Sequence, residues 1–287
     1  MSKFKRRRTV QRRSYQAAKQ TRFTGGWGTS NGSSDTELVQ DLTVLRSRSR
    51  ALVRDSSYAK RAKVLVQNNV IGSGIGMQAQ VKSTRGKLNK RINDAIESAW
   101  TEWSYAENCH TGGRLSFENL ERALMGQVFE AGEVFVRKHH AEFGNSSIPL
   151  ALELIEAERI ADQLDTAGIA PLLGNQLRMG IEVDRFHRPV AYYIRSRHPS
   201  ELRFSVPREE IERVPADQIV HLALVDRWPQ TRGEPWLHTA ARKLNDMDSY
   251  SEAELDRARV QACSVGAIET PEDASAFATE ASEDPSV

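Results

Sequence analysis

The chain has very little cysteine and lacks long apolar runs. Only Cys109 and Cys263 occur among 287 residues, so we expect neither a disulfide framework nor a zinc site of closely spaced ligands. No stretch of about 18 apolar residues could span a membrane, and no apolar segment of a secretory signal follows the basic amino terminus. The sequence therefore predicts a protein without a membrane partner, which stays in the cytosol or enters a particle assembled there.

Motifs for catalysis and nucleotide binding are also missing. The sequence contains no nucleophile elbow, Walker loop or HExxH motif. The glycine run GSGIG at 72–76 follows a predicted helix instead of a strand, and its spacing differs from that of a dinucleotide-binding loop. The acidic pairs Glu156/Glu158 and Glu209/Glu210 lack the partners of a general acid and base, and we interpret them as surface or ion-pair residues. We expect no catalytic residue, no metal site and no cofactor.

A thiol nucleophile is the enzymatic alternative, because Cys109 stands beside His110. Side chains that are neighbours in sequence rarely face each other, and a catalytic Cys-His pair normally joins distant segments. We interpret Cys109 as a partly buried structural residue. The alternative, a hydrolase such as a maturation protease, predicts that Cys109→Ala abolishes a measurable cleavage.

The small net charge of +2 conceals a strong polarity along the chain. Residues 1–34 carry nine Lys or Arg and no acid, whereas residues 269–287 carry six acids and no base. Such a basic arm suits contact with nucleic acid through phosphate neutralisation, and it also fits a flexible, solubilising terminus. The arm residues predicted to contact DNA or a protein partner are Arg6, Arg7, Arg8, Arg12 and Arg13.

The first half of the chain is predicted to be helical. A Gly/Ser linker at 25–34 precedes a helix that Ser34 or Asp35 can cap. Further amphipathic helices are predicted at 58–70, at 86–106 and from Ser116 to 131. Three arginines recur at every fourth position of the first helix, which places them on one face: Arg46, Arg50 and Arg54. This basic stripe suits a solvated face or a contact with DNA or a partner.

The apolar period changes to that of strands after Gly132. Strands are predicted at 133–137, 149–155 and 218–224, together with a hairpin of 180–184 and 189–194. A final helix at 235–263 would be about 40 Å long at about 1.5 Å per residue. Its outer positions are densely charged, which suggests a rod that packs against neighbouring copies. The basic residues at these positions include Arg242, Lys243, Arg257 and Arg259. The predicted fold class is α+β, with a helical amino-terminal part, a mainly antiparallel sheet in the middle and one long carboxy-terminal helix.

Three stretches resemble the lambda-type portal family of tailed phages. Residues 46–80 have an arginine-rich helix, a Tyr-Ala pair and a helix that ends in VIGSG. Residues 154–162 (LIEAERIAD) and 180–199 (GIEVDRFHRPVAYYIRSRHP) resemble a second family segment. Residues 214–250 contain a strand, the loop QTRGEPW and the start of the long helix. The resemblance covers residues from about 40 to 268 in the family's order.

Composition and the resemblance together imply a division of the chain into four parts. These are a flexible basic arm at 1–34, a portal wing domain at 35–234 with helices at 35–131 and a sheet at 132–225, a stem-like helix at 235–263, and an acidic, disordered tail at 264–287. The clip, the returning stem helix, the tunnel loop and the crown of the family find no counterpart, so we expect an incomplete portal.

The family's function is structural. The resemblance implies a dodecameric ring at one capsid vertex, through which duplex DNA is packaged and ejected without sequence specificity. Its partners would be the terminase, capsid or scaffold proteins and head-tail connector proteins, in the virion and, during assembly, in the host cytoplasm. The alternative from another class is a DNA-binding or DNA-processing protein that uses the basic arm, which predicts tight binding by a monomer that weakens steeply with salt.

Overall fold

The computed structural model describes residues 22, 26, 28, 31–163, 174–201 and 210–263. The arm arginines from Arg6 to Arg13 and the acidic tail at 264–287 lie outside the described residues. The helices are α1 (Ser34–Asp55), α2 (Ser57–Val70), α3 (Lys90–Trp103), α4 (Ala106–Cys109), α5 (Phe117–Ala131) and α6 (His238–Cys263), with short 3-10 helices η2 (Ala157–Arg159) and η5 (Ala216–Gln218). The strands are β1 (Glu133–His139), β2 (Ala151–Ile155), β3 (Gln176–Arg178), β4 (Ile181–Val183), β5 (Pro189–Arg195), β6 (Ile211–Pro215) and β7 (Ile219–Ala223).

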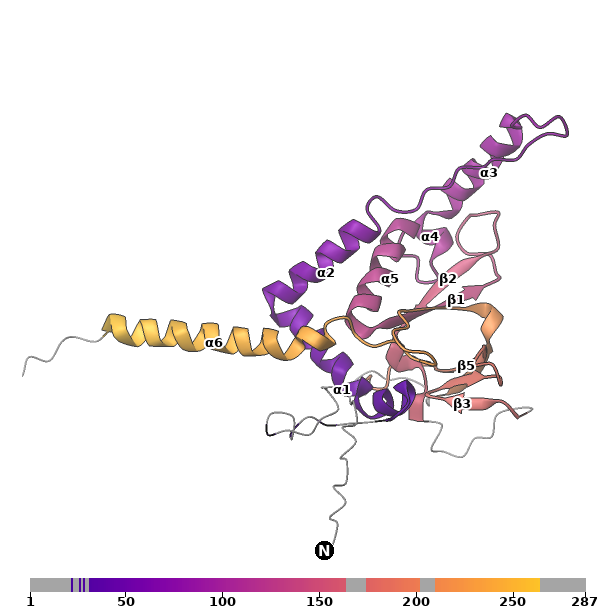
Figure 1. Ribbon diagram of the computed structural model, residues 1–287. Helices are drawn as coiled ribbons and strands as arrows, with labels where there is room; N and C mark the ends of the chain where they lie inside the picture. Colours follow the sequence, from indigo (N-terminus) through magenta and orange to yellow (C-terminus); the bar gives the residue numbers. More distant parts are fainter. Residues whose placement is uncertain are drawn as a thin grey trace, which may run out of the picture.

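The element order confirms the α+β prediction: helices come first, then antiparallel strands, then one long helix (Figure 1). Within the described ranges, no helix combines the length and the apolar character needed to cross a membrane.

The strands form two sheets where the sequence predicted one. One sheet has the order β2-β1-β7 and the other the order β3-β4-β5-β6, and every pairing is antiparallel. The predicted hairpin is confirmed as β4 and β5. The two sheets share one apolar core, because Phe135 and Ile155 of the first contact a cluster that includes Tyr192 and Ile194 of the second. The ring centroids of Phe135 and Tyr192 are 5.6 Å apart.

The beginning of α1 is tied to the loop that follows β7. The helix cap is Ser33, one or two positions before the predicted cap, and its Oγ accepts a hydrogen bond from the backbone N–H of Thr36 at 3.2 Å. Asp35 has a different role, because its carboxylate accepts bonds from the Thr231 N–H at 2.8 Å and from Arg178 Nη1 at 3.1 Å. One acidic side chain therefore links the first helix to the second sheet and to the loop before α6.

Two parts of the molecule project from this body. The helix α3 is shorter than predicted, and it extends away from the body together with the loop before it, as Figure 1 shows. At its base Trp103 is buried and Trp100 is half-buried, and both pack on Phe117. The helix α6 leaves the body on another side; it has 26 residues, of which none is buried. Its base rests on α1, α2 and α5 through Leu237, the residue just before the helix, and through Leu244.

Candidate functional site at the base of the long helix

Arg232 lies in the loop between β7 and α6 and is fully buried. Its Nε donates to Glu133 Oε1 at 2.7 Å, its Nη1 to the Met179 carbonyl at 2.7 Å and its Nη2 to the Ala157 carbonyl at 2.9 Å. These acceptors belong to β1, to the turn between β3 and β4, and to η2. A planar guanidinium carries its donors in a fixed fork, a geometry that suits this attachment to three segments. The loop before α6 is therefore attached to both sheets through one side chain.

Glu133 is the centre of this buried cluster. Besides Arg232, its Oε1 accepts a bond from Arg46 Nη2, while its Oε2 accepts from the Gly233 N–H at 2.9 Å and from His221 Nε2 at 2.8 Å. Burial alone opposes ionisation of this carboxyl, but Arg232, Arg46 and His221 outweigh it and hold the pKa of Glu133 well below its usual range. The carboxylate is therefore charged and fully hydrogen-bonded inside the protein.

The backbone on either side of this cluster comes into direct contact. Gly132 ends α5 in the left-handed region, at a φ of 86°, and a Cβ there would lie 2.2 Å from the carbonyl carbon of Glu234. A Cβ on Gly233 would lie 2.2 Å from the carbonyl oxygen of Gly132. Only glycine allows two chain segments to approach so closely. The base of α6 is thus fixed against the junction of α5 and β1.

The structure corrects the predicted basic stripe of α1. Arg46 is buried, and its Nε donates to the Ala131 carbonyl at 3.0 Å, so it is not a surface contact in this structure. Arg50 is half-buried in an ion pair with Glu158 at 2.7 Å. Arg54 is exposed beside Asp55. The three arginines differ because α1 lies against the body, so its periodicity places only part of this face in solvent.

The predicted basic residues of the long helix are on its surface. Arg242 lies 3.9 Å from Asp246, Arg259 lies 3.0 Å from Asp256, and Arg257 pairs with Glu254. Lys243 is exposed as well. Most of the positive charge of α6 is therefore balanced by acids of the same helix.

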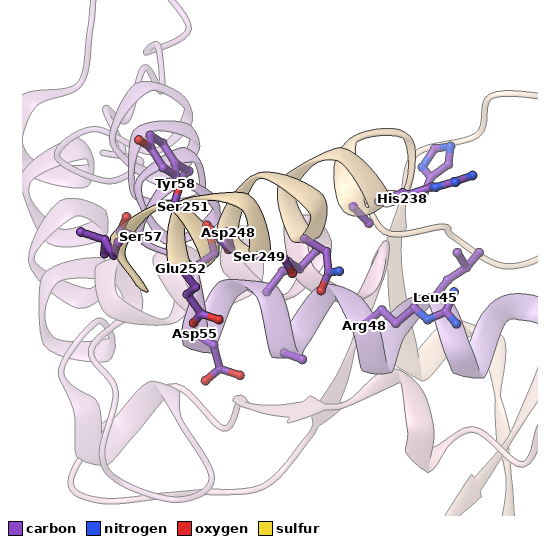
Figure 2. Close-up of a pocket in the computed structure, with 17 residues that line it drawn as sticks. Leu45, Arg48, Asp55, Ser57, Tyr58, His238, Asp248, Ser249, Ser251 and Glu252 are labelled. Atoms are coloured by element: carbon purple, nitrogen blue, oxygen red, sulfur yellow. The ribbon is translucent and has the colours of Figure 1, made fainter. Parts of the chain in front are cut away.

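A groove runs between α1, the start of α2 and α6 (Figure 2). Its volume is about 1120 Å³. Leu45, Leu52 and Leu255 supply apolar surface to it. Figure 2 shows Asp55 and Glu252 toward one end of the groove and Arg48 toward the other. Its lining is thus partly apolar and has carboxylates gathered at one end.

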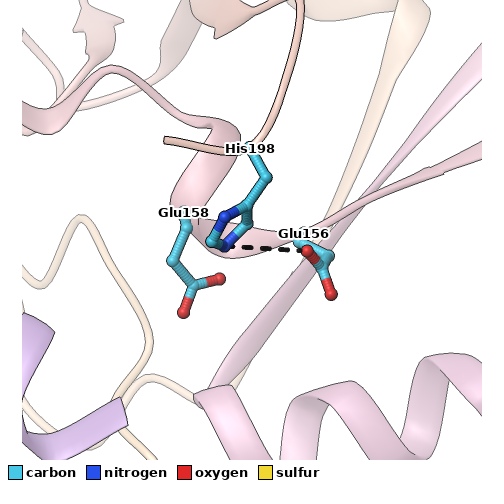
Figure 3. A group of neighbouring side chains, drawn as sticks. All are labelled: Glu156, Glu158 and His198. Atoms are coloured by element: carbon cyan, nitrogen blue, oxygen red, sulfur yellow. Dashed lines mark ion pairs between the residues drawn. The ribbon is translucent and has the colours of Figure 1, made fainter. Parts of the chain in front are cut away.

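Glu156, Glu158 and His198 form a second group of polar side chains (Figure 3). Their ligand atoms lie within 4.8 Å of one another, a spacing that a metal ion could use. However, His198 Nδ1 accepts a bond from the Ser200 N–H at 3.1 Å, so the neutral ring carries its proton on Nε2, the nitrogen 3.9 Å from Glu156. Arg50 already neutralises Glu158. The arrangement is an ion-pair cluster, as predicted for Glu158.

The environment of Cys109 does not suit a nucleophile. The thiol is buried, its Sγ lies 3.5 Å from the Leu115 carbonyl oxygen, and burial raises the pKa of the thiol. The neighbouring His110 accepts a bond from the Arg114 N–H at its Nδ1. The side chain of Cys109 therefore stays protonated at neutral pH.

The cluster of Glu133 and Arg232 was missed by sequence reasoning. Glu133 was assigned only to a strand, and Arg232 only to a motif. A usable signal was present in both segments, since each places a charged residue directly beside a glycine, in Gly132-Glu133 and Arg232-Gly233.

A family model described as "Phage portal protein, lambda family" matches residues 20–286. The chain belongs to this family. The portal chain is 34% identical over 252 residues to the "Probable portal protein" of Halomonas phage phiHAP-1, a match that covers 85% of the chain and 46% of that relative. It thus spans about half the length of the curated relative. Proteins of this family are structural, non-enzymatic components of a virion.

Two solved structures are also similar to the portal chain. A chain in "Virion of native gene transfer agent (GTA) particle" has a TM-score of 0.44 and 15% identity, over 75% of the portal chain and 45% of that chain. A chain in "Neck of empty GTA particle computed with C6 symmetry" has a TM-score of 0.45 and 15% identity, over 72% and 46% of the two chains.

Proposed function

We propose that the chain supplies the wing and the first stem helix of a dodecameric portal ring, with the wing at 35–234 and the stem at 235–263. The observation that carries this is α6, a helix of 26 residues without a buried side chain, whose base is held in the body by Arg232 and Glu133. A helix of this length rises about 39 Å. Its base is fixed in the body, and Leu255 and Val260 in its outer part are exposed, as a subunit of a channel wall needs.

The exposed apolar residues of α6 support assembly of copies. Leu255 and Val260 are largely exposed on this helix. Burial of apolar surface contributes about 25 cal/mol per Å², so contact with a neighbour would stabilise this face. Copies related by a closed rotation bury the same pair of surfaces at every contact, which makes a ring the natural assembly.

The charges of α6 support passage of DNA without a tight grip. The ion pairs of Arg242, Arg257 and Arg259 with acids of the same helix leave little positive charge for phosphates. Affinity for duplex DNA grows with the number of phosphates that are neutralised, and a channel that bound many of them would hold the duplex. In this proposal duplex DNA moves through the ring during packaging and ejection without being read.

The remaining partners follow from the role of a portal at a capsid vertex. They are the terminase, capsid or scaffold proteins, and head-tail connector proteins, and assembly takes place in the host cytoplasm. The basic arm at 1–34 and the exposed Arg54 are proposed contacts with DNA or with one of these proteins.

Negative-stain microscopy of the purified chain tests the proposal, alone and together with the polypeptide encoded directly downstream. We expect rings of about a dozen subunits in at least one preparation. Monomers in both preparations, with tight binding of short DNA duplexes that weakens steeply between low and moderate salt, would instead support a DNA-binding protein that uses its arm.

A further inference from the structure

The helix α3 and the loop before it form a finger, residues 77–103. The loop is held against the helix by bonds from the Ala79 N–H to Glu97 Oε1 at 2.9 Å and from the Val81 N–H to Asn93 Oδ1 at 2.8 Å. The Asn89 N–H also donates to the Val81 carbonyl at 2.9 Å. The finger is therefore a built element with a defined surface.

One face of the finger is apolar and exposed. Ile92 and Ile96 are one turn apart on α3, which places them in one row, and they are 43% and 38% exposed. Leu88, in the loop just before the helix, is 62% exposed. The same row continues to Trp103, which is buried at the base of the finger. The row thus begins inside the body and continues outward onto an exposed surface, a pattern that marks a binding face more often than a monomer surface.

The charges of the finger are segregated along its length. Residues 72–93 contain no acid, and their five basic residues are Lys82, Arg85, Lys87, Lys90 and Arg91. The acids of the finger, Asp94, Glu97 and Glu102, lie toward its base. The tip is therefore positive, and a matching surface needs apolar side chains with carboxylates at one end.

The groove between α1 and α6 has this composition. It offers Leu52 and Leu255 as apolar lining, with Asp55, Asp248 and Glu252 among its acids. Its lining also includes two arginines, Arg48 and Arg242, and Arg48 lies away from Asp55 and Glu252 in Figure 2.

We propose that the finger of one copy docks in the α1–α6 groove of the next copy, with the basic tip toward the acidic end. The inference deepens the proposed function, since it rests on the formation of a ring. The finger and α6 project from different sides of the body (Figure 1), so one molecule offers both surfaces to different neighbours. Two unlike surfaces of this kind give a head-to-tail contact, which closes into a ring when the rotation between copies allows it.

Charged substitutions in the two apolar surfaces test the contact. Ile92→Asp in the finger and Leu255→Asp in the groove are each expected to abolish rings seen by light scattering and microscopy. Leu65→Asp on α2 and Tyr250→Asp on α6 are matched controls, because both residues are exposed and neither lines the groove. Circular dichroism checks that all four variants are folded, and we expect the two controls to keep their rings.

Mixing the two interface variants tests the head-to-tail arrangement. A finger-defective copy and a groove-defective copy retain one intact contact between them, so an equimolar mixture is expected to give dimers and nothing larger. Either variant alone is expected to stay monomeric.

Chemical cross-linking gives an independent reading. In a Cys263→Ser background, a chain that carries both Ile92→Cys and Leu255→Cys is expected to give a ladder of multimers with a short bis-maleimide. A chain with either cysteine alone is expected to give none.

The outcomes separate this inference from the ring itself. Rings that survive Ile92→Asp and show no cross-linked ladder overturn the finger contact and leave the ring proposal standing. If Leu255→Asp abolishes the rings and Ile92→Asp does not, another segment occupies the groove. This result also overturns the inference. A chain that stays monomeric in every preparation overturns both proposals.

Discussion

At the scale of single residues, Glu133 determines how the centre of the molecule is held together. Its two oxygens accept bonds from two arginines, one histidine and one backbone N–H, and no water is needed to satisfy them. A buried charge is tolerated when its partners supply both opposite charge and hydrogen bonds. The cluster is a structural hub, because the groups that it joins come from α1, β1, β7 and the loop before α6.

Replacing Glu133 by glutamine tests this role. Glu133→Gln leaves Arg46 and Arg232 buried without their counter-charge, so we expect a loss of about 3–5 kcal/mol in the free energy of unfolding. The matched control is Glu212→Gln, which removes an ion pair of the half-exposed Arg137 with an exposed carboxylate and should cost about 1 kcal/mol or less. Urea unfolding followed by circular dichroism measures both. Equal losses for the two variants would contradict the structural role of the cluster.

The sequence could not specify which charged residues are buried. The spacing of Arg46, Arg50 and Arg54 correctly places them on one side of a helix, yet it does not say which of them meets the body. That depends on Glu133, which is 87 residues from Arg46 along the chain. An ion pair between residues so far apart in sequence produces no local periodic pattern, so the buried cluster was not predictable from the spacing of residues.

At the scale of elements, α6 is anchored at its base by the residue that precedes it. Leu237 is 6% exposed and packs with Val53, Ala59 and Phe129, whereas the outer part of the helix has no such contacts with described residues. Local stability should therefore fall along α6 from its base to its end.

A pair of leucine substitutions, one just before α6 and one in its outer part, tests this gradient. Leu237→Ala leaves a cavity in a buried cluster, and we expect it to cost about 2–5 kcal/mol. Leu255→Ala, at a position that is 58% exposed, should change the stability of the monomer by less than about 0.5 kcal/mol. Denaturant unfolding at a concentration where the chain is monomeric gives the stabilities, and limited proteolysis shows whether α6 has been released. Comparable costs for the two variants would argue against an anchor at the base.

Local elements were predicted well and their assembly was not. The hairpin of β4 and β5 was correct because its two strands are joined by a short turn, and the long helix was correct because its apolar period persists for many residues. The division into two sheets was missed because β1 pairs with β7, about eighty residues later in the chain. The groove was missed for the same reason, since its two walls are α1 and α6.

At the scale of the whole molecule, stability should depend on acid pH. Burial opposes ionisation of Glu133 and Glu153, but their basic partners outweigh it and lower both pKa values from the ordinary 4.5. A depressed carboxyl pKa contributes stability that is present above the unfolded pKa and is lost as pH falls through the folded pKa. We therefore expect the free energy of unfolding to decline below about pH 4.5.

Urea unfolding between pH 7 and pH 3 measures this dependence. The Glu133→Gln variant, already less stable at neutral pH, should lose less on acidification than the parent chain, because it lacks the carboxyl with the strongly lowered pKa. A parent and a variant with the same acid slope would show that Glu133 is not the group responsible.

The three-way attachment of Arg232 has a mechanical consequence. A pull on α6 along its axis reaches the preceding loop, where the guanidinium is bonded to β1, to η2 and to the turn before β4. These bonds carry the load side by side, so they have to rupture together and cannot be unzipped one after another. In the proposed ring, a force on α6 from moving duplex DNA would reach both sheets at once. The helix would then keep its direction under tension.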